Sequence, residues 1–223
     1  MKRAAVPLIL FLFGFVLGIL CLFPMVGREP AAAAVLSPVQ GSSEGESKET
    51  PACSSQDTAA LLRSAAEVAQ ALKHGNYDVL ARYVHPERGV TFTPYSTVNL
   101  EADQTFTPDQ IRELEQDETR YLWGYEDGRG EPIQMTIREF LQEFIFSADY
   151  TQAPAVGVDE VVMSGNSLEN LQEAYPDCRF VDLCYPELDP AYGGLDWCSL
   201  KMVFAPTQSG WYLVGLIHSQ WTI

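Results

Sequence analysis

The chain has 223 residues, of which 47% are hydrophobic and 20% are charged, and its formal net charge is -16 at pH 7. This length is sufficient for one domain with a sizeable core. The acidic balance opposes nucleic acid and anionic lipid as partners, although it also describes an ordinary soluble surface.

Residues 1–26 are predicted to be a transmembrane anchor or a signal segment. Lys2 and Arg3 precede an uncharged apolar run from Ala4 to Val26. A helix over most of this run matches the roughly 30 Å hydrocarbon core, whereas a signal h-region has about 7 to 15 residues. We therefore expect a single-pass anchor in the cell membrane with the domain outside the cytoplasm. Cleavage near Ala31–Ala34 is the alternative and would give a secreted protein.

A disordered linker is predicted at residues 27–56, which are rich in Ala, Ser, Pro and Glu and contain scarcely any large apolar side chain. The charges of residues 1–56 cancel, so the whole net charge lies in residues 57–223. We expect residues 57–223 to form a single α+β domain.

Helices and one strand are predicted first in this domain. Apolar residues at helical spacing over 62–72 end before Gly75, and Asn76 can cap a second short helix. That helix must finish before Pro86, because a residue that precedes proline avoids the helical region. A short strand follows over 90–98, with Pro94 at its edge or its end.

Two capping boxes predict two more helices, one at Thr107 with Gln110 and one at Thr136 with Glu139. Between them, Asp127–Gly128 favours a hairpin or a tight connection.

The last third of the chain is predicted to be β. The segments 178–184 and 198–204 read as strands, and the last one, over 211–223, is apolar on both faces. A strand covered on both sides is central in its sheet.

Four of the five cysteines lie outside the apolar segment: Cys53, Cys178, Cys184 and Cys198. Cys178 and Cys184 would be about 20 Å apart on one extended strand, beyond the reach of a disulfide. Since Cys198 opens the next strand, we expect a bridge from Cys184 to Cys198. Neither CxxC nor HxxxH spacing occurs, so we expect no metal site and no cofactor.

This order of elements resembles the cone-shaped α+β superfamily of nuclear transport factor two, ketosteroid isomerase and scytalone dehydratase. The resemblance covers about residues 57–223 and rests on the element order and the tryptophan-rich terminal hairpin. It implies N-terminal helices packed in a curved, mainly antiparallel, cone-like sheet with a pocket at the open end. The enzymes of this superfamily place Asp, Tyr or His in that pocket, but no local motif assigns a catalytic position here.

His218 is the first candidate for catalysis, with Tyr95 or Asp196 as its partner. It shares the strand register of Val214 and Leu216. If that face looks into the cone, desolvation lowers the pKa of the imidazole and keeps it neutral, ready to act as a base. A core histidine bonded to the backbone is the alternative.

Aromatic residues form the second set of candidates, for ligand binding: Trp123, Tyr125, Trp197 and Trp221, together with His85. Such side chains can form a platform for a small molecule or a cell-wall fragment, although packing is their commoner use. The position of His85 at a helix end also fits a simple structural corner.

Catalytic motifs such as GxSxG, HExxH, the P-loop and GxGxxG are absent from the sequence. We therefore expect an exported, membrane-tethered, non-catalytic domain that binds a small molecule, a cell-wall fragment or a protein. One alternative is a lyase or isomerase that uses a histidine in the cone pocket. Another is a subunit-assembly domain that forms a homodimer through the outer face of its sheet.

Overall fold

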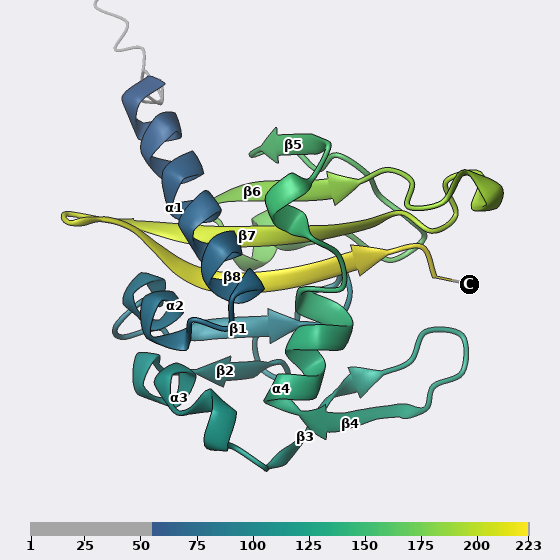
Figure 1. The fold of residues 1–223 in the computed structure, drawn as a ribbon, viewed down its shortest axis with the longest axis horizontal. Helices are drawn as coiled ribbons and strands as arrows, with labels where there is room; N and C mark the ends of the chain where they lie inside the picture. Colours follow the sequence, from purple (N-terminus) through teal and green to yellow (C-terminus); the bar gives the residue numbers. More distant parts are fainter. Residues whose placement is uncertain (1–54, 223) are drawn as a thin grey trace, which may run out of the picture. The chain divides into compact units, whose positions relative to one another are not determined.

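The computed structural model describes residues 55–222, which form an α+β fold (Figure 1). The predicted membrane segment at 1–26 and nearly all of the predicted linker at 27–56 lie outside the described residues. Within 55–222, no helix has both the length and the apolar character that crossing a bilayer requires.

Local sequence determines where the helices begin. The side chain of Asn76 accepts a hydrogen bond from the backbone N–H of Val79, and both predicted capping boxes, at Thr107 and Thr136, are formed. One π-helical turn over residues 141–145 extends α4. The helices are α1 (Ser55–Lys73), α2 (Tyr77–Tyr83), α3 (Pro108–Arg112), α4 (Ile137–Phe140) and α5 (Leu171–Ala174).

The main sheet has six strands in the order β2-β1-β8-β7-β6-β5 and is antiparallel except between β1 and β8. β8 is central, as its two apolar faces predict. β3 and β4 form a separate hairpin whose connection contains the predicted turn at Asp127–Gly128. The strands are β1 (Val90–Thr93), β2 (Gln104–Phe106), β3 (Arg120–Tyr125), β4 (Pro132–Thr136), β5 (Ala155–Val158), β6 (Arg179–Tyr185), β7 (Cys198–Thr207) and β8 (Gly210–Gln220).

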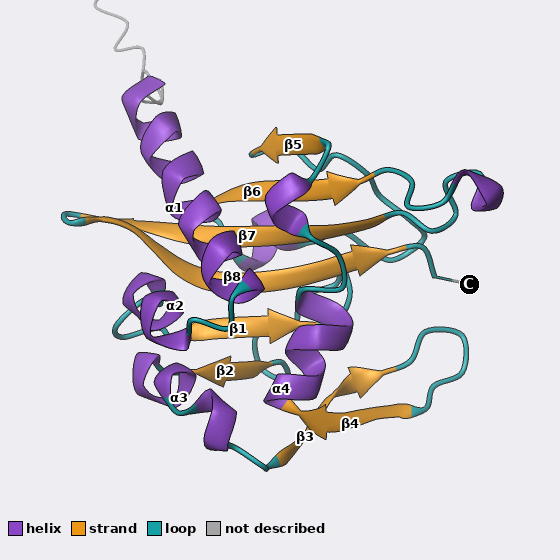
Figure 2. Cartoon of the chain, in the orientation of Figure 1, coloured by secondary structure: helices purple, strands orange, loops and turns teal. Residues whose placement is uncertain are grey.

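The curved sheet is covered on both faces. Helices α1, α2 and α4 lie over the inner face (Figure 2), where Leu200 and Leu216 of the sheet belong to the same buried cluster as Leu61 and Phe140 of the helices. On the outer face, Leu171 and Tyr175 close a second cluster over β7 and β8. The chain's own residues therefore cover the part of the outer face over β7 and β8, and the homodimer through this face stays a prediction.

A β-bulge in β8 changes the register that strict alternation predicts. Val203 of β7 pairs with Gly215 and the next residue pairs with Leu213, so Val214 is an extra residue. Leu213 and Leu216 consequently both face the inner cluster, and Val214 faces the outer one. The expectation that Val214, Leu216 and His218 share one face is wrong for Val214, since the bulge lies between them.

Residues 159–170 form a strap that crosses the outer side of the sheet. Polar contacts hold it: the amide side chain of Asn170 accepts from the backbone N–H of Val98 at 2.8 Å and donates to its carbonyl at 2.9 Å, and Thr97 donates to the carbonyl of Leu168 at 2.8 Å. Gly165 of the strap lies against Trp197, where an added Cβ would be 3.3 Å from the indole. The strap is thus fixed at several points along its length.

A buried lysine joins the strap to the sheet. Lys201 is 0% exposed, its ammonium lies 2.8 Å from the carboxylate of Glu169, and it donates to Ser219 at 2.5 Å. Asp182 pairs with Lys201 across β6 and β7; burial raises the pKa of this carboxyl and the nearby lysine opposes the change. A buried cation of this kind is tolerated because carboxylates surround it.

The predicted disulfide between Cys184 and Cys198 is not formed, and Cys178, Cys184 and Cys198 are free thiols. β6, which carries Cys184, and β7, which carries Cys198, are neighbouring strands, as expected. However, Cys184 pairs with Ser199 and Cys198 pairs with Tyr185, so the two thiols point to opposite faces of the sheet. Burial raises the pKa of the Cys184 thiol to about 12.

We predict that Lys201→Ala lowers the free energy of unfolding by about 3–5 kcal/mol, because it leaves Glu169 and Asp182 without their buried partner. Urea unfolding measures the change. Lys73→Ala is the matched control: Lys73 also pairs with a carboxylate at 2.8 Å, but both side chains are over a third exposed, so about 1 kcal/mol or less is expected. Equal losses in the two variants would contradict this account.

Candidate functional site

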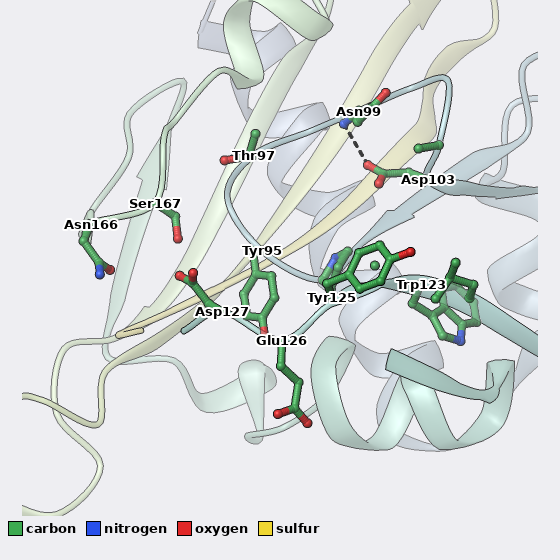
Figure 3. A pocket seen from close by; sticks show the side chains of 14 residues that line it. Tyr95, Thr97, Asn99, Asp103, Trp123, Tyr125, Glu126, Asp127, Asn166 and Ser167 are labelled. Atoms are coloured by element: carbon green, nitrogen blue, oxygen red, sulfur yellow. Dashed lines mark hydrogen bonds between the residues drawn. The ribbon is translucent and has the colours of Figure 1, made fainter. Parts of the chain in front are cut away.

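A cavity of about 680 Å³ lies beyond the ends of β1 and β3 (Figure 3). Three separate segments line it: residues 94–103 between β1 and β2, residues 122–127 at the end of β3, and Asn166 and Ser167 of the strap. A volume of this size is typical of sites for small organic ligands.

Backbone geometry brings these segments together. The strand predicted over 90–98 ends already at Thr93, because Pro94 lacks the backbone N–H that would continue the ladder, and the chain turns there toward the cavity. A bulge between Leu122 and Gly124 in β3 turns the end of that strand, and the backbone N–H of Glu126 donates to Glu131 at 2.7 Å to close the hairpin. Thr222 donates to Asn166 at 2.8 Å and so holds the strap at the cavity edge.

A second cavity of about 360 Å³ adjoins the first, since Tyr95, Glu126 and Asp127 line both. It adds Arg129, Glu143 and Trp221, among other residues. We call the two cavities together the Tyr95 groove.

Aromatic side chains of the groove differ in exposure. Trp123 is 2% exposed, stacks on Phe140 at 3.9 Å between ring centroids, and donates to the carbonyl of Met135. By contrast, Tyr125 is 60% exposed and Trp221 is 44% exposed. Tyr125 and Trp221 are therefore available to a ligand, while Trp123 supports the cavity wall from the core.

Asp103 is a carboxylate of the groove that the sequence did not single out. It accepts hydrogen bonds from the hydroxyl of Thr93 at 2.7 Å and from the backbone N–H of Asn99 at 3.0 Å. Burial raises its pKa, and these two hydrogen bonds act against the change. In the sequence, Asp103 looks like an ordinary turn residue. Only the fold places it with Trp123 in the lining of one cavity.

Tyr95 lies among the negatively charged side chains of the groove. Burial is the main reason that its pKa is raised, and the charges of Asp127, Glu126 and Glu143 raise it further. The backbone N–H of Asp127 favours the ionised hydroxyl and so acts on the pKa of Tyr95 in the opposite direction. The groove thus combines an aromatic floor with a negative potential.

His218 is buried beneath the groove and lines neither cavity. Its ring meets Phe144 edge-on at 5.8 Å, and Phe144 in turn meets Tyr95 at 6.1 Å, so a phenyl ring stands between the two catalytic candidates. Desolvation lowers the pKa of the imidazole to about 4, and a hydrogen bond that the ring donates to the side chain of Gln220 opposes the shift. The side chain is neutral at pH 7, in agreement with the desolvation argument.

The remaining sequence candidates lie apart from the groove. The imidazole of His85 accepts from the backbone N–H groups of Glu87 and Arg88, so it closes the corner between α2 and β1. Trp197 is 2% exposed beneath the strap, and Asp196 accepts from the backbone N–H of Asp189 at 2.6 Å. The structure therefore brings Tyr95, Trp123, Tyr125 and Trp221 together, but not His85, Trp197, Asp196 or His218.

Within residues 55–222, no three His, Cys, Asp or Glu side chains are placed to hold a metal ion. The carboxylates of the groove are spread along its length and do not converge on one point in a ligand set.

The depressed pKa of His218 predicts a pH-dependent stability. Between pH 6.5 and about 4 the unfolded histidine binds a proton that the folded one does not, so stability falls as pH falls through this window. The shift in pKa corresponds to a loss of about 3 kcal/mol in the free energy of unfolding across this window. Urea unfolding at pH 7 and pH 4 should show this component in the parent chain and not in His218→Gln, and equal pH dependence in the two would refute it.

Comparisons with known proteins concern the fold. No protein-family model and no curated protein matches the chain. Similar solved structures include an NTF2-like protein with a cystatin-like fold from Novosphingobium aromaticivorans, with 10% identity, 74% of this chain and 82% of that chain covered, and a TM-score of 0.37. An NTF2-like family protein from Streptomyces avermitilis has 14% identity, coverage of 75% and 98%, and a TM-score of 0.37. A CamKII hub homology domain from Chlamydomonas reinhardtii has 16% identity, coverage of 73% and 97%, and a TM-score of 0.30. Two of these three similar structures are described as NTF2-like.

Proposed function

We propose that this chain is an exported, membrane-tethered, non-catalytic domain that binds a small organic ligand in the Tyr95 groove. The single observation that carries the proposal is the 680 Å³ cavity, in which aromatic and polar side chains from three distant segments meet. The tether and the export rest on the apolar run from Ala4 to Val26. A protease added outside intact cells should cleave the domain if it is exported. Detection of Met1 in the mature protein would show that the N-terminal segment is not removed and can act as the tether.

Exposed aromatic side chains support binding over packing alone. Tyr125 and Trp221 stand at the groove with 60% and 44% of their surface accessible, whereas a side chain used only for packing is buried. Tyr95, which is half-buried, lies between them and lines both cavities. A flat ring of a ligand can contact these faces without any rearrangement of the core.

The position of His218 supports a non-catalytic role. A general base must come within hydrogen-bond reach of the proton that it removes, directly or through one water. Phe144 separates His218 from Tyr95, and His218 is 1% exposed. This separation favours binding over the alternative lyase or isomerase mechanism through this histidine.

Asp103 favours a second candidate function, acid–base catalysis on a small molecule. It is a half-buried carboxylate that lines the cavity, and its pKa is raised, which is the property that a general acid or base needs. Turnover of a groove ligand that is lost in Asp103→Asn, while the ligand still binds, would establish this function in place of the first.

We predict that Tyr125→Ala weakens the binding of groove ligands about tenfold or more, because it removes the largest exposed aromatic face of the cavity. Saturation-transfer NMR with a fragment library, on the full-length chain in a polyoxyethylene detergent, identifies the ligands and ranks the variants. Trp221→Ala should weaken ligands of the second cavity in the same way.

Two matched variants make this result specific. Tyr192→Ala removes an equally exposed tyrosine, 62% accessible, from a turn outside the groove and should leave binding unchanged. His218→Gln should also bind normally. Fragments that bind the parent chain and Tyr125→Ala equally well would show that the groove is not the binding site.

A further inference from the structure

We propose that the Tyr95 groove recognises an organic cation, a ligand that carries a quaternary or alkylated ammonium group. This inference rests on the proposed function and adds the chemical class of the ligand. It comes from the charges along the groove, the aromatic faces between them, and the lack of a convergent metal-ligand set.

Carboxylates dominate the ionisable side chains of the groove. Asp103 lines the first cavity, Glu126 and Asp127 line both cavities, and Glu143 lines the second. Arg129 is the only cation among the lining residues of these two cavities, and its guanidinium lies 3.8 Å from the carboxylate of Glu126. The groove therefore carries a negative charge that a bound cation would compensate.

These charges act at the centre of the groove rather than only at its rim. Tyr95 lines both cavities, and the carboxylates of Asp127, Glu126 and Glu143 all act on its hydroxyl in the direction that disfavours a second negative charge. An anionic ligand in this position would meet the same repulsion. A cation would be attracted by every one of these groups.

The aromatic rings of the groove favour one class of cation, an ammonium group with alkyl substituents. Tyr95 and Tyr125 line the first cavity, and Tyr95 and Trp221 line the second. The negative face of an aromatic ring attracts an ammonium group with alkyl substituents, which also loses little hydration when it is buried. Figure 3 shows Tyr95 and Tyr125 in the cavity together with Glu126 and Asp127.

A bare metal ion is disfavoured by the same geometry. Calcium and magnesium need several oxygen ligands that converge at 2.0–2.6 Å, and within residues 55–222 no such group of three or more acidic, His or Cys side chains exists. An alkylammonium needs no such convergence, because its charge is spread over a larger surface. The cavity of about 680 Å³ is also much larger than an ion requires.

Choline and its neutral isostere 3,3-dimethylbutan-1-ol provide the test, since the two have the same shape and differ in charge. Isothermal titration calorimetry on the full-length chain in a polyoxyethylene detergent should show choline binding at least tenfold more tightly at low ionic strength. Added salt should reduce this preference, because the carboxylates of the groove are partly exposed. Tyr125→Ala should weaken choline about tenfold.

Asp127→Asn should reduce choline affinity severalfold and leave the neutral isostere unchanged, because it removes one charge that lines both cavities. Asp78→Asn is the control: Asp78 is an exposed carboxylate on α2 that lines neither of the two cavities, and its loss should have no effect.

The outcomes separate this inference from the proposed function. Equal affinity for choline and the isostere would overturn the inference that the ligand is a cation. The same holds if choline does not bind while neutral or anionic fragments bind in a Tyr125-dependent way. Either result would leave the proposed binding site intact. If no fragment responds to Tyr125→Ala and choline does not bind, both proposals fail.

Discussion

The fit of β8 between β1 and β7 fixes the position of nearly every other part of the domain. β8 pairs in parallel with β1 and antiparallel with β7, and its two faces contact separate buried clusters. The bulge at Val214 lets Leu213 and Leu216 both reach the helices. Gly215 follows it, where a Cβ would come within 2.9 Å of the Tyr175 hydroxyl, so a larger residue would force the side chain of Tyr175 to shift.

The groove is a consequence of where this framework stops. β1 ends before Pro94 and β8 ends before Trp221, so the chain segments that follow these strands line the cavities. Loops on a rigid scaffold are the usual place for binding residues, because they can vary without loss of the core. The strap completes the wall, and the buried pair of Lys201 with Glu169 fastens it to the sheet.

Burial affects the ionisable groups of the domain in different ways. His218 is neutral within the core, and Lys201 keeps its carboxylate partners beside it. The carboxylates along the groove have no such buried partner and remain at least partly exposed to solvent. Acidic side chains of the domain therefore lie both on its surface and along a groove with aromatic walls.

The sequence by itself determined the helix starts at Asn76, Thr107 and Thr136, because caps act through neighbouring residues. Hydrophobic alternation likewise identified β7 and the central place of β8. Tertiary structure alone decided to which side of the sheet the two cysteines point and which residues meet in the groove. The pairing register directs Cys184 and Cys198 to opposite sides, and the fold adds Asp103 to the aromatic residues of the groove. Register and loop convergence depend on contacts between residues far apart in sequence, which no local pattern contains.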